Sequence, residues 1–217
     1  TLKTHSKKIL ADTITPVSVY LRLRDRFPNS LLLESSDYRA NDNTFSYICC
    51  KPIASITVKD EIITESFPDG KTTTTSIDYT TDVVGIIEAF AKKFETADND
   101  KKFIQNGLFG YMSYDAVRYF EDIEITKKEG ALEVPDFYYA VYQNIIAINH
   151  FNNEAYIFSH TYKEENNLSE IAQLLTVKSF AEYHFKLEGD QQSQMSDEAY
   201  IDLVKTCKKH CQRGDVF

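Results

Sequence analysis

The chain has 217 residues and a formal net charge of −9, with 33 acidic against 24 basic side chains. Its length and 42% hydrophobic content are typical of one large globular domain, or slightly more, with a sizeable core. The acidic charge argues against nucleic acid as a partner, because phosphate binding needs a basic face. No apolar run approaches the ~20 residues of a membrane span, so no membrane partner is expected.

Four cysteines occur as two close pairs, Cys49-Cys50 and Cys207 with Cys211. Such a low cysteine density without a disulfide framework predicts a reducing, cytoplasmic location. His210 stands beside the second pair and could join it in a metal cluster. No fourth ligand is apparent, so packing of the two thiols in a core is the favoured interpretation.

The N-terminal part predicts a helix followed by a strand. Thr15 is suited to be the N-cap and Pro16 the first helical residue. Three leucines at 31–33 then predict a strand buried on both faces, which ends in Glu34 and Ser35. A carboxylate there is either a satisfied structural corner or part of a polar pocket for a ligand with an ammonium group. Local rules alone favour the corner.

The following residues alternate short strand patterns with amphipathic helices. The expected elements are a strand at 44–49, a hairpin of 54–59 and 61–66, a Thr-rich edge strand at 71–77, a helix at 82–95, a Gly-aromatic strand at 106–115, a short helix at 116–121, a hairpin of 137–151 and 154–162, and a helix at 168–175. Pro52 separates the first two strands. The predicted fold class is therefore α+β, with largely antiparallel β-sheets and packed helices.

The C-terminal residues predict a linker and one more helix. Residues 188–194 are polar and lack periodicity, Ser196 can cap the helix, and Gly214 can close it. We therefore predict a domain over 1–187, a linker over 188–195 and the truncated start of a further domain over 196–217. The protein is expected to continue beyond this start.

No local motif for catalysis stands out. The five histidines are scattered, and none sits in a local motif with Ser or Cys. Asp115 and Glu121 flank a short predicted helix and could act as general acid and base, although a surface role is favoured. Gly107 and Gly110 do not have the spacing of a phosphate-binding loop, and they suggest close approach of another backbone instead.

Three segments together resemble the N-terminal region of anthranilate synthase component I. The first is residues 15–36 followed by Phe45-Ser46-Tyr47-Ile48, and the second is the Gly-aromatic stretch 107–118, which ends in Asp-Ala-Val-Arg. The third runs from Tyr200 to the final Gly-Asp-Val-Phe at 214–217. Each motif is only moderately specific, so their common order and spacing carry the resemblance.

The resemblance implies an enzyme of tryptophan biosynthesis, a lyase. The complete large subunit converts chorismate and ammonia, with Mg²⁺, to anthranilate and pyruvate, and a partner glutamine amidotransferase subunit (component II) supplies the ammonia. In this family the catalytic and magnesium residues lie in the C-terminal domain, beyond Phe217. No catalytic or metal residue is therefore assigned here, and the chain alone is expected to be inactive.

The resemblance also implies a tryptophan feedback site. The Leu-Leu-Glu-Ser segment places Glu34 and Ser35 in contact with the effector, and Phe45 and Ser46 of the next strand complete the candidate set. Glu34 suits the ammonium group of tryptophan, and a serine hydroxyl can donate or accept. Some family members have a basic residue where this chain has Phe45, so the effector carboxylate is expected to be held differently.

Two alternatives remain open. Aminodeoxychorismate synthase component I of the folate pathway shares the Gly-aromatic segment, but it more often has Asp-Ser where this chain has Glu34 and Ser35. The second alternative is a free-standing amino-acid-binding module that never belonged to an enzyme. The sequence that follows Phe217 would distinguish the module from an enzyme.

Overall fold

The computed structural model describes residues 2–34, 44–96, 101, 103–123, 125, 134–163, 165–176, 183–190 and 192–216. It divides into two compact units, Thr1–Ala181 and Glu182–Phe217. The elements in chain order are β1 (Lys3–Leu10), α1 (Pro16–Arg24), β2 (Leu31–Leu33), β3 (Phe45–Lys59), β4 (Ile62–Ser66), β5 (Thr72–Ser76), α2 (Val83–Lys92), β6 (Phe109–Met112), the 3₁₀-helix η1 (Tyr114–Tyr119), β7 (Phe137–Asn149), β8 (Glu154–Thr161), α3 (Leu168–Thr176) and α4 (Asp197–Arg213).

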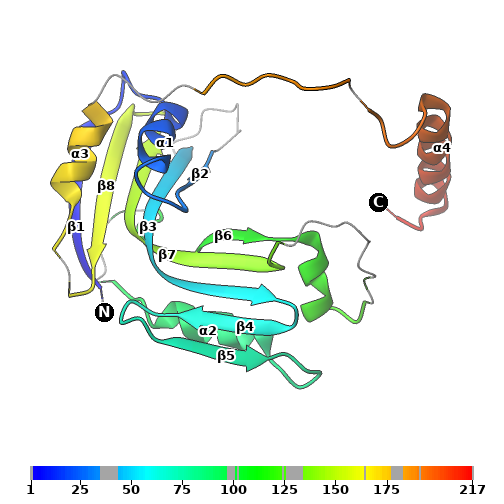
Figure 1. Cartoon of the computed structure of the whole chain (residues 1–217), viewed down its shortest axis with the longest axis horizontal. Coiled ribbons are helices and arrows are strands. Elements are labelled where there is room, and N and C mark those ends of the chain that lie inside the picture. Colours follow the sequence, from blue (N-terminus) through cyan, green and yellow to red (C-terminus); the bar gives the residue numbers. More distant parts are fainter. Residues whose placement is uncertain are drawn as a thin grey trace. The chain divides into compact units, whose positions relative to one another are not determined.

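The first unit is built on a single antiparallel sheet of eight strands. The main order is β1-β8-β7-β3-β4-β5, with β2 also paired to β3 and β6 also paired to β7. The long strands β3 and β7 form its centre and pair from Phe45 opposite Asn149 to Val58 opposite Phe137 (Figure 1). This architecture confirms the predicted α+β fold class, and β5 takes the predicted place at an edge.

Strand β3 passes through the position where the sequence predicts an interruption. Lys51 has a φ of 60°, and the pairing with β7 shifts register between Pro52 and Ala54. The prediction of two separate strands is therefore wrong. Proline has no N–H for the ladder, and a local bulge accommodates it while the strand continues in a new direction.

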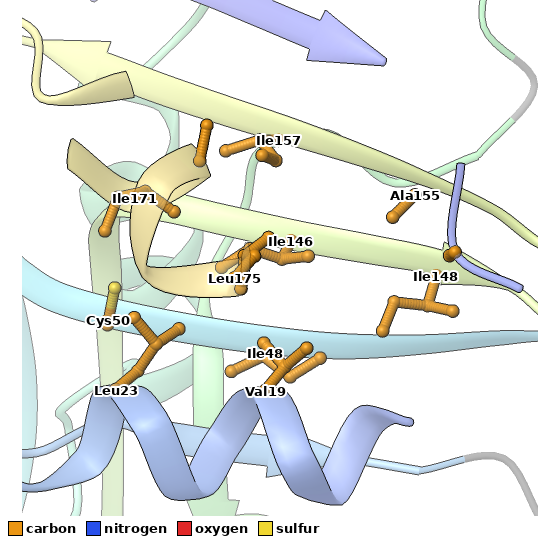
Figure 2. Packing of buried hydrophobic residues seen from close by; sticks show 12 residues of the cluster. Val19, Leu23, Ile48, Cys50, Ile146, Ile148, Ala155, Ile157, Ile171 and Leu175 are labelled. Carbon is orange, nitrogen blue, oxygen red and sulfur yellow. The ribbon is translucent and has the colours of Figure 1, made fainter. Parts of the chain in front are cut away.

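Helices α1 and α3 pack on one face of the sheet. Figure 2 shows Val19 and Leu23 of α1 pointing at Ile48 and Cys50 of β3, all fully buried. The helix begins as predicted, because the Thr15 hydroxyl accepts a hydrogen bond from the Ser18 N–H at 3.1 Å. The two helices therefore cover this face of the sheet around Ile48 and Cys50.

A second core lies under the other half of the sheet. The predicted apolar stripe of α2 packs there through Phe90, which is fully buried together with Ile56 and Val58 of β3. A side chain added at Gly110 of β6 would meet the Tyr138 carbonyl of β7, which confirms the predicted close backbone approach there. At Gly107 an added side chain would meet no described atom within 4 Å, so the prediction is wrong for that residue. No element is predicted before residue 15, whereas the structure has the edge strand β1 there.

The second unit contains α4 and the residues before it. Ser196 caps the helix by accepting from the Ala199 N–H at 3.3 Å, and Gly214 closes it with a φ of 78°, as predicted. Cys207 and Cys211 are exposed, so the expected packing of these thiols in a core is not found in the described part of the chain. The prediction that 196–217 begins a further domain stays a prediction.

Two kinds of feature are not found among the described residues. No group of three or more His, Cys, Asp or Glu side chains is placed to hold a metal ion. No described helix is both long enough and apolar enough to cross a membrane.

The bend of the sheet buries an amide side chain. Gln143 is 1% exposed and lies in β7 between Tyr142, which pairs with Pro52, and Asn144, which pairs with Cys50. Neither polar atom of its side chain has a hydrogen-bond partner among the described residues. A buried amide without a partner destabilises the fold, because it has lost its hydrogen bonds to water.

Replacing Gln143 by leucine should therefore stabilise the chain. We expect the free energy of unfolding of Gln143→Leu to rise by about 1–2 kcal/mol, measured by urea denaturation followed by circular dichroism.

The matched control is Ile146→Gln on the same strand, where the isoleucine is 0% exposed. This variant should lower the free energy of unfolding by about 2–4 kcal/mol, because it places an amide in an apolar core. If Gln143→Leu also loses more than about 1 kcal/mol, the amide is satisfied and the prediction is wrong.

Candidate effector site

Glu34 lies directly after β2, at one side of the sheet. Leu33 pairs with Tyr47 of β3, and the same register continued by one residue places Glu34 level with Ser46. Glu34 is exposed. Strand β2 is only partly buried, with Leu33 42% exposed, so the expectation of burial on both faces is wrong. The strand has three residues and, among the described residues, pairs with β3 alone.

Ser46 occupies a closed position in β3. Its side chain is fully buried, and its hydroxyl lies 2.7 Å from Nε2 of His150, with the donor depending on the histidine tautomer. The backbone N–H of His150 also donates to the Thr44 carbonyl at 3.1 Å. These two hydrogen bonds connect the start of β3 to the turn after β7.

Phe45 belongs to an aromatic group on the opposite face of the sheet from Ser46. Its ring stacks on that of Phe103, with ring centroids 4.7 Å apart and an angle of 25° between the planes. The Phe103 ring in turn contacts the Tyr156 ring, with centroids 4.9 Å apart. Tyr47, two residues along β3, also stacks on Phe45. We call Phe45, Tyr47, Phe103 and Tyr156 the aromatic group. Phe103 and Tyr156 are distant in the sequence and are not predicted to belong to it, and only the alternation of Phe45 and Tyr47 along one strand indicates an aromatic face.

The structure therefore brings the sequence-predicted site residues to one corner of the sheet but not to one surface. Neighbouring residues of a strand face opposite sides, so Phe45 and Ser46 cannot both line the same wall of a pocket. Ser35 lies outside the described residues. An exposed carboxylate at Glu34 can accept hydrogen bonds from an ammonium group, and the aromatic group can stack with a planar ring.

The Gly-aromatic motif ends in an ion pair that stabilises the fold. Arg118 donates through Nη2 to Oδ2 of Asp136 at 2.6 Å, and the Tyr119 hydroxyl donates to the same oxygen at 2.7 Å. Burial raises the pKa of the Tyr119 hydroxyl, and its bond to the Asp136 carboxylate acts in the same direction. Asp115 is half-buried in the first turn of η1, and Glu121 is exposed just after it, which fits the favoured surface role.

Comparison with known proteins gives consistent relatives. Anthranilate synthase component 1 of Lactococcus lactis is 27% identical over 97% of this chain and 46% of that protein. The protein of the same name from Saccharomyces cerevisiae is 27% identical over 94% of this chain and 42% of its own length. Aminodeoxychorismate synthase component 1 of Bacillus subtilis is 24% identical over 97% and 45%. The chain thus spans about half the length of the curated relatives it matches.

A solved structure has the same fold. The crystal structure of anthranilate synthase component I from Streptococcus pneumoniae superimposes with a TM-score of 0.55 at 17% sequence identity, covering 97% of this chain and 46% of that one. At this identity the likeness establishes the fold alone. Residues 14–217 match the family described as chorismate binding enzyme. Because the match covers nearly the whole chain, this protein belongs to the chorismate binding enzyme family.

Proposed function

We propose that this chain is the N-terminal, regulatory part of an anthranilate synthase component I. The observation that carries the proposal is the family match over residues 14–217, together with relatives of that name that align over nearly the whole chain. The complete enzyme would convert chorismate and ammonia to anthranilate and pyruvate in tryptophan biosynthesis. A glutamine amidotransferase subunit, component II, would supply the ammonia.

The proposal assigns no catalytic step to this chain. The reaction is proposed to use Mg²⁺, but the described residues contain no cluster suited to hold a metal ion. The magnesium ligands and the chorismate contacts are therefore proposed to come from the remainder of the enzyme. The buried thiols of Cys49 and Cys50 are free, which fits a reducing cytoplasm as the location.

The proposed role of this chain is to carry part of a tryptophan feedback site. Glu34 offers an exposed carboxylate for the effector's ammonium, and Ser35 follows it directly in the sequence. Phe45 lies on the opposite face of β3 from Ser46 and stacks on Phe103, so it is proposed to support the site from behind the strand rather than to share the ligand with Glu34. Ser46 is buried and bonded to His150, so it is proposed to hold β3 in place beside Glu34 rather than to touch the effector.

Feedback requires that tryptophan binds two arrangements of the enzyme with different affinity. Inhibition follows if the effector favours the less active arrangement. A site at the corner of β2 and β3 is suited to this, because Glu34 is exposed and free to contact a second body.

A second candidate is aminodeoxychorismate synthase component I. The Bacillus subtilis relative of that name supports it with coverage similar to that of the anthranilate synthases. The two candidates differ in product. Chromatography of the products of the full-length enzyme with chorismate and ammonia should show anthranilate, and aminodeoxychorismate would establish the second candidate instead.

The chain by itself should not turn over chorismate. Incubation of the 217-residue chain with chorismate, ammonia and Mg²⁺ is expected to give no anthranilate fluorescence, because the catalytic residues are proposed to lie elsewhere. The full-length enzyme at equal concentration is the positive control. Turnover by the short chain would disprove its regulatory assignment.

Removing the carboxylate of Glu34 should weaken feedback without stopping catalysis. In the full-length enzyme, we expect Glu34→Gln to raise the tryptophan concentration for half-inhibition by roughly tenfold or more, since a charge-assisted hydrogen bond is lost. Ser35→Phe should relieve inhibition by filling the site. Initial rates measured with and without tryptophan check both.

The matched control is Glu88→Gln, which removes another exposed carboxylate, on α2, where it pairs with Lys92. Its inhibition curve should match that of the unmodified enzyme. Unchanged inhibition in both Glu34→Gln and Ser35→Phe would show that the effector binds elsewhere.

A further inference from the structure

A pocket of about 510 Å³ lies between β1, α1 and α3, on the face of the sheet that these helices cover. Its volume is within the range of about 300–1,000 Å³ that is usual for small-molecule sites. The lining residues are Lys7, Ile9, Leu10, Thr13, Ile14, Arg22, Ala172, Leu175 and Thr176. None of them belongs to the proposed effector site.

The charged residues that line this pocket are both cations. Lys7 comes from β1 and Arg22 from α1, while no carboxylate lines the pocket among the residues that the structure describes. Two cations without an acid are notable in a chain whose formal net charge is −9. Such a lining attracts an anion and disfavours an ammonium group.

Arg22 is held in place but has hydrogen-bonding capacity left. Its Nη1 donates to the Leu175 carbonyl in the last turn of α3 at 2.7 Å, which fixes the guanidinium against the pocket wall. Its Nε is buried and has no hydrogen-bond partner in the described part of the chain. A guanidinium has five N–H donors, of which the Leu175 carbonyl takes one. A carboxylate is the acceptor that matches the remaining planar donors best.

The rest of the pocket is mainly apolar. Ala172 and Leu175 are part of the buried core, and Figure 2 shows Leu175 of α3 lying over Ile146 of the sheet. Ile9 and Ile14 pack against the edge of the same core. Leu10 is 69% exposed, so a large apolar side chain at the pocket is left for a ligand to cover.

We propose that this pocket is a second ligand site, which takes a small carboxylic acid with an apolar body and no ammonium group. The carboxylate binds between Arg22 and Lys7, and the body covers Ile9, Leu10 and Ile14. This preference is opposite to that expected around Glu34, whose carboxylate suits an ammonium. The proposal is independent of the tryptophan site.

The test uses three probes that share a phenyl ring and a short chain. They are 3-phenylpropionate, L-phenylalanine and 2-phenylethylamine, an anion, a zwitterion and a cation. Titration of the ¹⁵N-labelled 217-residue chain, followed by NMR, should show saturable shifts for 3-phenylpropionate at residues 7–14 and 172–176. L-Phenylalanine should bind at least roughly tenfold more weakly, and the amine should not bind, because the described lining residues have two cations and no carboxylate to pair with an ammonium.

Variants identify the residues responsible. Arg22→Gln should weaken 3-phenylpropionate by roughly tenfold or more, and Lys7→Gln by a smaller factor, because Lys7 is exposed and its charge is better solvated. The matched controls are Arg24→Gln on α1 and Lys3→Gln on β1, which do not line the pocket and should leave the affinity unchanged.

Arg22→Gln removes the bond to the Leu175 carbonyl, so its fold is checked by circular dichroism, and Lys7→Gln serves as the variant that leaves this bond intact. Three results would each overturn the proposal. They are no saturable binding of 3-phenylpropionate, equal binding of 2-phenylethylamine, and unchanged affinity in folded Arg22→Gln and Lys7→Gln.

Discussion

The antiparallel pairing of β3 with β7 is the constraint on which the rest of the first unit depends. The two strands run side by side over most of their length, and they bring residues 45–59 against residues 137–149. Every other strand is attached to this pair directly or through one more strand. Such non-local pairing must bring distant parts of the chain together, so the intervening residues are arranged by it rather than by their own preferences.

The bend in that pair separates two of the hydrophobic cores of this unit. The ladder shifts between Pro52 and Ala54. Beyond the shift, Ile56 and Val58 of β3 pack with α2, whereas Ile48 and Cys50 before it pack with α1 and α3. The bend leaves the Gln143 amide buried. It also allows β2 and β4 to pair with successive halves of the same edge of β3, so that Glu34 lies at the corner where β2 ends.

The two proposed sites have opposite electrostatic character, although both lie at margins of the same half-sheet. Glu34 presents a carboxylate at the end of β2, and the pocket of Arg22 presents cations beside an aliphatic wall. A ligand with an ammonium is therefore directed to the first and a simple carboxylate to the second. Helix α1 connects them in structure, because it follows the pocket residue Thr13 and precedes β2.

The sequence by itself determined the local elements and the family. Thr15 and Ser196 mark helix starts because their side chains cap free N–H groups, and the apolar stripe of α2 identifies its buried face, both of which are short-range effects. Only the tertiary structure decided that β3 continues through Pro52, that Phe45 stacks on Phe103, and that Arg22 meets the end of α3. These features depend on contacts between residues far apart in the chain, and no local pattern of side chains encodes which distant strand or helix will be the partner.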